Sequence, residues 1–195
     1  MAKLNIFQQV RELENWRATA FALTLTERMY PNYQLFCEIT GFADASVARH
    51  LLNLLWDWIA VTRSKINFEV QLLKLEEVTP EPRSFDNYGV FPALDFVVSL
   101  ESVVNQISGE DAQGAVVVSK VSQGCVESYI EATAEEELDN ATIKHHPLMQ
   151  WERDFQQDLI NLLTSDMKRN RETVNRLRDE ASLEGISNIG IEISK

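Results

Sequence analysis

Apolar residues recur in steps of three and four along most of the chain, which is the spacing of an amphipathic helix. The pattern is longest at the end, where no glycine or proline interrupts the chain between Pro147 and Gly185. We therefore predict one closing helix over this stretch, roughly 55 Å long. Pro147 suits the first helical position, and Gly185 suits the left-handed residue that follows a helix.

The second half of this predicted helix, from Met167 to Ala181, has the narrower apolar stripe. We expect the first half, through Leu163, to lie in the core. The second half would then be available to a second copy of the chain, with Asn170 setting the register. The residues predicted at this interface are Met167, Asn170, Val174 and Leu177.

Capping residues, glycines and prolines divide the rest of the chain into shorter helices. The Tyr30–Pro31 step predicts a helix boundary, because a residue before proline avoids helical angles. The predicted segments are a first helix capped by Asn5, then Asn15–Met29, Pro31–Gly41, a fourth capped by Asp44, Asn67–Thr79, Pro92–Gly109 and Asp111–Glu137. The fourth is apolar on nearly all sides, so we expect it at the centre of the fold.

Two segments allow other structures. Residues 115–121 are rich in valine, which also suits a strand, but a lone strand would have no partner, so we favour helix. After Gly185, isoleucines alternate with other residues at Ile189, Ile191 and Ile193. This period of two predicts an extended tail lying along the body. The fold class that we predict is all-α, with about eight helices in one domain over residues 1–195.

Composition indicates a cytoplasmic protein. Cys37 and Cys125 lie within apolar helical patterns, so we expect two reduced, buried thiols. The N-terminus lacks the apolar core of a signal peptide, and no apolar run is long enough to span a membrane. We expect no membrane partner.

The formal net charge is −12 at pH 7. This charge disfavours nucleic acid as a partner, because proteins bind phosphate backbones through Lys and Arg. The charge is uneven, since residues 110–139 are strongly acidic and residues 166–178 are basic. The two stretches could attract each other within one chain or between two chains, or each could be a solvated helix face.

Three motifs occur in order along the chain. They are Glu27-Arg28-Met29-Tyr30-Pro31-Asn32-Tyr33 with Phe36-Cys37, then Tyr88-Gly89-Val90-Phe91-Pro92-Ala93-Leu94-Asp95, and Ser187-Asn188-Ile189-Gly190-Ile191. With these motifs the chain resembles the YjaG-like family of uncharacterised bacterial proteins. The resemblance covers nearly the whole chain and implies a compact, all-helical cytoplasmic protein. It implies no substrate, cofactor or catalytic residue.

The two aromatic-proline turns are the best candidate for a ligand site. If each proline begins a helix, free N–H groups at both helix starts could face one anion. The candidate ligand-binding residues are Arg28, Tyr30, Asn32, Tyr33, Tyr88 and Asp95. The structural alternative is that Arg28 pairs with Asp57 or Asp95 and that the tyrosines pack the corners.

Metal and cofactor chemistry has less support. His145 and His146 could be metal ligands together with nearby carboxylates, but adjacent residues seldom reach one ion, and His146 also suits the cap of the last helix. Glu127, Glu131 and Glu135 recur every four residues and could hold a cation or form a solvated acidic face. No nucleotide-binding or nucleophile motif occurs, so we name no catalytic residue and expect no cofactor.

These observations favour a non-enzymatic interaction or adaptor protein, with an unknown protein partner or a homodimer formed through the C-terminal helix. The alternative is a small-molecule-binding protein or metal-dependent hydrolase with its site at the Tyr30–Pro31 and Phe91–Pro92 turns. The sequence leaves open whether the protein is an enzyme.

Overall fold

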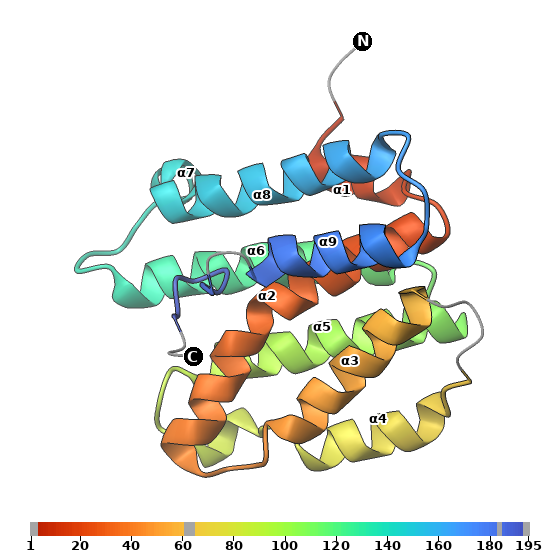
Figure 1. The fold of residues 1–195 in the computed structure, drawn as a ribbon. Helices are drawn as coiled ribbons and strands as arrows, with labels where there is room; N and C mark the ends of the chain where they lie inside the picture. The colour runs from red at the N-terminus through yellow and green to blue at the C-terminus, as the bar shows by residue number, and fades with distance from the viewer. Residues whose placement is uncertain (1–3, 61–64, 183–184, 193–195) are drawn as a thin grey trace.

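The computed structural model describes residues 4–60, 65–182 and 185–192. Helices account for most of these residues and pack around one continuous hydrophobic core (Figure 1). The helices are α1 (Ile6–Arg11), α2 (Trp16–Thr40), α3 (Ser46–Ala60), α4 (Phe68–Glu77), α5 (Val90–Ser108), α6 (Gly114–Thr133), α7 (Asn140–His145), α8 (Pro147–Thr164) and α9 (Arg171–Ser182), with a short 3₁₀ turn η1 (Pro82–Ser84) before α5. The predicted all-α fold is confirmed.

The central helix is α2, which packs against α3, α5, α6, α8 and α9. The predicted boundary at Tyr30–Pro31 is wrong, because α2 runs through Pro31 without ending. A proline inside a helix lacks one N–H donor and crowds the carbonyl four residues earlier. Contacts on nearly every side of α2 offset this cost, since every residue from Thr19 to Tyr30 is buried. The prediction that α3 is the centre is also wrong.

The predicted closing helix is two helices. Helix α8 ends at Thr164, and the chain turns back through residues 165–170 before α9 begins at Arg171. Two polar side chains make the break: the Ser165 hydroxyl donates to the Leu162 carbonyl at 2.6 Å, and Asn170 Oδ1 accepts the Thr173 N–H at 2.8 Å. Arg169 holds the turn against α3 by donating to the carbonyl of Ile59 at 2.8 Å. The chain therefore needs neither glycine nor proline to stop this helix.

The valine-rich segment 115–121 lies within α6, so the preference for helix over strand is confirmed. Helix α6 ends at Thr133, and this separates Glu135 from the helical face that carries Glu127 and Glu131. The predicted row of three carboxylates on one helix is therefore wrong. Both Cys37 and Cys125 are free and buried, as expected.

The tail after Gly185 forms a tight turn. Ile186 and Glu192 make an isolated antiparallel bridge, and Gly190 has a positive φ of 81°. Adjacent residues Asn188 and Ile189 are both buried, which the predicted period of two does not allow. The predicted extended tail is thus wrong over residues 186–192, while Ile193 lies outside the described residues.

Among the described helices, α5 alone is long and apolar enough to cross a membrane by length and composition. Many of its apolar side chains, including Phe96, Leu100 and Val103, are buried in the core, while Phe91 is half exposed. Helix α5 packs against α2 and α6. The apolar composition of α5 is therefore that of a helix packed in the core.

Candidate functional site

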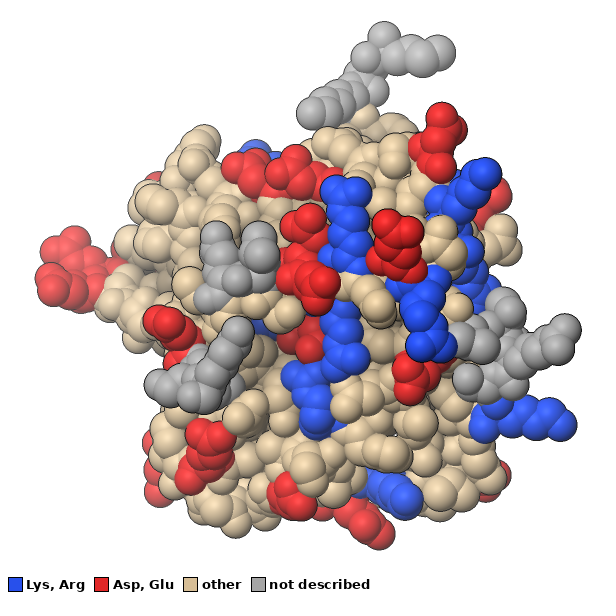
Figure 2. Space-filling model, in the orientation of Figure 1, with Lys and Arg blue, Asp and Glu red and all other residues tan. Residues whose placement is uncertain are grey.

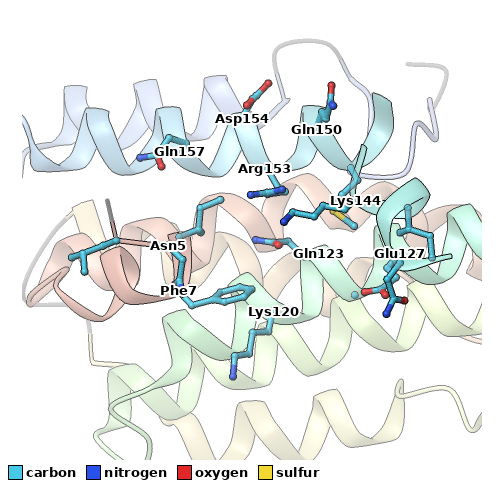
Figure 3. A pocket seen from close by; sticks show the side chains of 16 residues that line it. Asn5, Phe7, Lys120, Gln123, Glu127, Lys144, Gln150, Arg153, Asp154 and Gln157 are labelled. Atoms are coloured by element: carbon cyan, nitrogen blue, oxygen red, sulfur yellow. The ribbon is translucent and has the colours of Figure 1, made fainter. Parts of the chain in front are cut away.

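An open groove of about 840 Å³ runs between α6 and α8, with α1 at one end and α7 at the other. Apolar side chains from α1, α7 and α8 line part of it, namely Ile6, Phe7, Ile143 and Met149. The polar lining includes amides from Asn5, Gln123, Asn140, Gln150 and Gln157 (Figure 3). The mixture of apolar walls with a few polar groups is typical of a small-molecule site.

Three basic side chains line this groove, each from a different helix. They are Lys120 of α6, Lys144 of α7 and Arg153 of α8. In Figure 3, Lys144 and Arg153 extend toward the middle of the groove together with Gln123, while Lys120 lies near Phe7 and points away from the middle. The Lys120 Nζ atom lies 5.8 Å from the centre of the Phe7 ring.

The basic side chains of the groove are not neutralised by ion pairs. The acidic residues Glu127 and Asp154 also line it. Yet none of the ion pairs found among the described residues includes Lys120, Lys144 or Arg153. Converging cations on low-dielectric walls raise the local positive potential, which attracts anions. The middle of the groove is therefore suited to an anionic group, although the chain as a whole is acidic.

Hydrogen bonds fix the walls of the groove. At the α1 end, Gln9 and Gln157 exchange two amide hydrogen bonds of 3.0 and 2.9 Å. In the floor, Gln123 Nε2 donates to Gln156 Oε1 at 3.1 Å. Because Gln156 is fully buried and donates to Glu152 Oε1 at 2.7 Å, the floor is connected to polar groups inside the protein.

Arg28, the first residue of the predicted ligand site, is buried in the core and forms an ion pair with Glu152. Neither of the expected partners, Asp57 or Asp95, makes this contact. The guanidinium also lies over the rings of Trp151 and Phe155, at 4.0 and 4.3 Å from their centroids. Arg28 therefore joins α2 to α8.

The other predicted ligand residues on α2 also make contacts inside the protein. The hydroxyls of Tyr30 and Tyr33 donate to the carbonyls of Ala45 and Val78, at 3.3 and 2.7 Å. Burial raises the pKa of both phenols. Asn32 Nδ2 donates to Asn188 Oδ1 at 2.9 Å. Since Pro31 lies inside α2, the expected pair of helix starts does not exist, and none of the six predicted residues lines the groove.

Tyr88 and Asp95 lie near Cys125 of α6. Burial raises the pKa of Tyr88, and the nearby acidic groups Cys125 and Asp95 raise it further. Burial also raises the pKa of Asp95 to about 6, while a hydrogen bond with Cys125 acts in the opposite direction. None of the ion pairs among the described residues includes Asp95. This carboxyl is consequently easier to protonate than an ordinary aspartate.

The two adjacent histidines contact the backbone. His145 Nδ1 lies 2.7 Å from the Ala141 carbonyl, and His146 Nδ1 accepts the Leu148 N–H at 3.2 Å. His146 is thus the N-cap of α8, as the sequence suggested. Residues 4–60, 65–182 and 185–192 contain no group of three or more His, Cys, Asp and Glu side chains placed to hold a metal ion.

The predicted interface residues belong mainly to the core. Val174 and Leu177 of α9 are 2% and 0% exposed, because α9 packs on α2 and α3. Met167 is half-buried, and Asn170 caps α9. The predicted dimer contact through Val174 and Leu177 is therefore wrong, since both side chains are covered by their own chain.

The outer surface of α9 carries charges of both signs (Figure 2). Arg176 pairs with Glu180 at 3.8 Å on this surface. Arg178 instead reaches Glu27 of α2, at 3.8 Å, and Asn53 of α3. The basic stretch thus contacts α2 and α3 within its own chain.

The groove residues were not identified from the sequence. Lys120, Gln123, Gly124 and Glu127 occupy one face of α6, at the i, i+3, i+4 and i+7 spacing. That spacing places the four residues on one helix face, but a helix face exposed to solvent shows the same spacing. Only the packing of α8 and α7 over this face brings Arg153 and Lys144 to it.

The fold and groove define an all-α protein with an open polar–apolar groove between α1, α6, α7 and α8. The chain belongs to the DUF416 family, described as a protein of unknown function, whose model matches residues 5–192. It is 39% identical over 187 residues to "Uncharacterized protein YjaG" of Escherichia coli K12, covering 95% of each chain. It is 36% identical to an "Uncharacterized protein" of Haemophilus influenzae, covering 96% of each. A solved crystal structure of a DUF416 family protein from Shewanella baltica superimposes with a TM-score of 0.92 at 36% identity, covering 98% of this chain and 100% of that one.

Proposed function

We propose that this protein is a cytoplasmic binding protein whose groove between α1, α6, α7 and α8 binds a small organic anion. The observation that carries the proposal is the pair Lys144 and Arg153. Both basic side chains extend into the groove, and the ion pairs among the described residues include neither (Figure 3). A carboxylate or phosphate group would neutralise both cations, and Arg can hold such a group with two parallel hydrogen bonds.

The size of the groove favours a small molecule. Its volume of about 840 Å³ lies within the range of roughly 300–1,000 Å³ that is usual for small-molecule sites. A stable protein partner would need to cover about 800 Å² of surface, which calls for a broader face. The proposal therefore adopts the alternative predicted from the sequence, a small-molecule-binding protein, in place of an interaction or adaptor protein. It moves the site from the aromatic-proline turns to the groove.

Thermal unfolding with a panel of anions tests the proposal. Inorganic phosphate, phenyl phosphate and octanoate are suitable probes, because they share a negative charge and differ in apolar area. A ligand present at 100 times its Kd adds about 2.7 kcal/mol to the free energy of unfolding. For a chain of this length, that raises Tm by on the order of 5 °C or more.

The double variant Lys144→Ala/Arg153→Ala should lose this shift. Arg83→Ala removes an exposed basic residue outside the groove and is the matched control, which should respond like the parent protein. Flat profiles for the parent with every probe, or equal shifts in the parent and the double variant, would contradict the proposal.

A further inference from the structure

A glycine within α6 has no structural explanation in its own surroundings. Gly124 is a helical residue without a positive φ, so alanine could adopt its backbone conformation. A Cβ atom added at Gly124 would meet nothing within 4 Å. Glycine weakens a helix interior relative to alanine, because it loses more conformational freedom on folding. The folded chain therefore gains no stability from having glycine at this position.

Gly114 of the same helix is the opposite case. A Cβ atom there would lie 2.5 Å from the Ser102 carbonyl oxygen and 2.8 Å from Gln106 Cβ. The close approach of α5 and α6 requires glycine at that point. Packing thus explains one glycine of α6 and leaves Gly124 without a reason.

The groove supplies a reason. Gly124 follows Gln123 in the floor and lines the same space as Phe7, Ile143 and Met149. The side chains on either side of it along this face of α6 are long and polar. A side chain at residue 124 would occupy the groove itself, because no other part of the described structure lies there.

We infer that Gly124 keeps the floor of the groove open for an apolar part of the ligand. The ligand class is then an amphipathic organic anion, in which a carboxylate or phosphate meets Lys144 and Arg153 and a hydrocarbon chain or ring lies over Gly124. This inference rests on the proposed function and specifies its ligand. It also explains why a position that would be more stable as alanine carries glycine.

A series of straight-chain carboxylates from acetate to octanoate tests the inference by titration calorimetry. Burial of each added methylene group in the groove should tighten binding by about fourfold. Gly124→Leu should place its side chain in the groove and weaken octanoate binding at least tenfold. Inorganic phosphate, which has no apolar part, should lose less affinity than octanoate in the same variant.

The matched variant Gly124→Ala should raise Tm and weaken octanoate binding less than Gly124→Leu does. If Gly124→Leu unfolds more easily than the parent, the comparison of Gly124→Ala with the parent replaces it. Octanoate binding that equals acetate binding in the parent, or that Gly124→Leu leaves unchanged, overturns the inference. In that case the proposed function still stands if phosphate binding depends on Lys144 and Arg153. If neither phosphate nor octanoate binds the parent protein, the proposed function fails together with the inference.

Discussion

Arg28 and Glu152 form an ion pair between α2 and α8, and the two side chains are only 3% and 0% exposed. Glu152 Oε1 also accepts hydrogen bonds from the Ser122 hydroxyl, at 2.6 Å, and from Gln156 Nε2. A buried charge is tolerated when it is paired and hydrogen-bonded. These contacts join three helices of the core, and the Gln156 amide extends them to the floor of the groove.

We predict that Glu152→Ala lowers the free energy of unfolding by about 3–5 kcal/mol, because it leaves the charge of Arg28 buried without a partner. Urea denaturation measures this loss. The double variant Arg28→Met/Glu152→Leu removes both charges and should recover most of it. If Glu152→Ala is as stable as the parent, the ion pair contributes nothing to the free energy of unfolding.

The tail turn should contribute to stability through Asn188. Its side chain is fully buried, accepts a hydrogen bond from Asn32 and donates to the Ser122 carbonyl at 3.3 Å. Asn188→Ala leaves the buried Asn32 amide without its partner, which should cost about 1–3 kcal/mol. The exposed Asn175 of α9 supplies the control Asn175→Ala, which should stay close to the parent. Equal denaturation midpoints for both variants would be inconsistent with a structural role for the tail.

Asp95 should make stability depend on pH. Its folded-state pKa of about 6 lies above the ordinary value of 3.8, so the folded protein binds a proton more tightly than the unfolded chain does. The proton on Asp95 therefore stabilises the folded state fully below pH 4, and this stabilisation is lost as the pH rises through about 6. We therefore expect Asp95→Asn to be more stable than the parent at pH 8, by about 3 kcal/mol, with little difference at pH 4. A difference that does not change between pH 4 and 8 would refute this.

Gly114→Ala should destabilise the contact between α5 and α6. The added methyl group would overlap the Ser102 carbonyl, and overpacking of this kind costs about 1–3 kcal/mol. The loss should appear as a lower Tm in a thermal melt. Unchanged stability would mean that the two helices can separate locally without cost.

Local signals in the sequence predicted most of the secondary structure. Asn67 caps α4 and Gly109 ends α5, because a side-chain oxygen and a left-handed glycine act within a few residues. The boundary at Pro31 failed for the opposite reason. The local preference of proline is outweighed there by the contacts of a helix buried on nearly every side, and such contacts come from distant segments.

The break between α8 and α9 was predictable in part. Ser165 and Asn170 are residues that favour caps over helix interiors, but their role was obscured by the continuous apolar stripe around them. The stripe exists because both helices bury one face in the same core. The groove was the least predictable feature, since Lys144 and Arg153 meet the floor of α6 only after three helices have packed.

Binding of an anion between α6 and α8 is tested most directly by chemical-shift mapping of the ¹⁵N-labelled protein during titration with octanoate. We predict saturable shifts centred on Gln123, Gly124, Lys144 and Arg153, which Lys144→Ala/Arg153→Ala abolishes. Shifts centred on α3, α4 or the outer face of α9, with the groove residues unaffected, would contradict it.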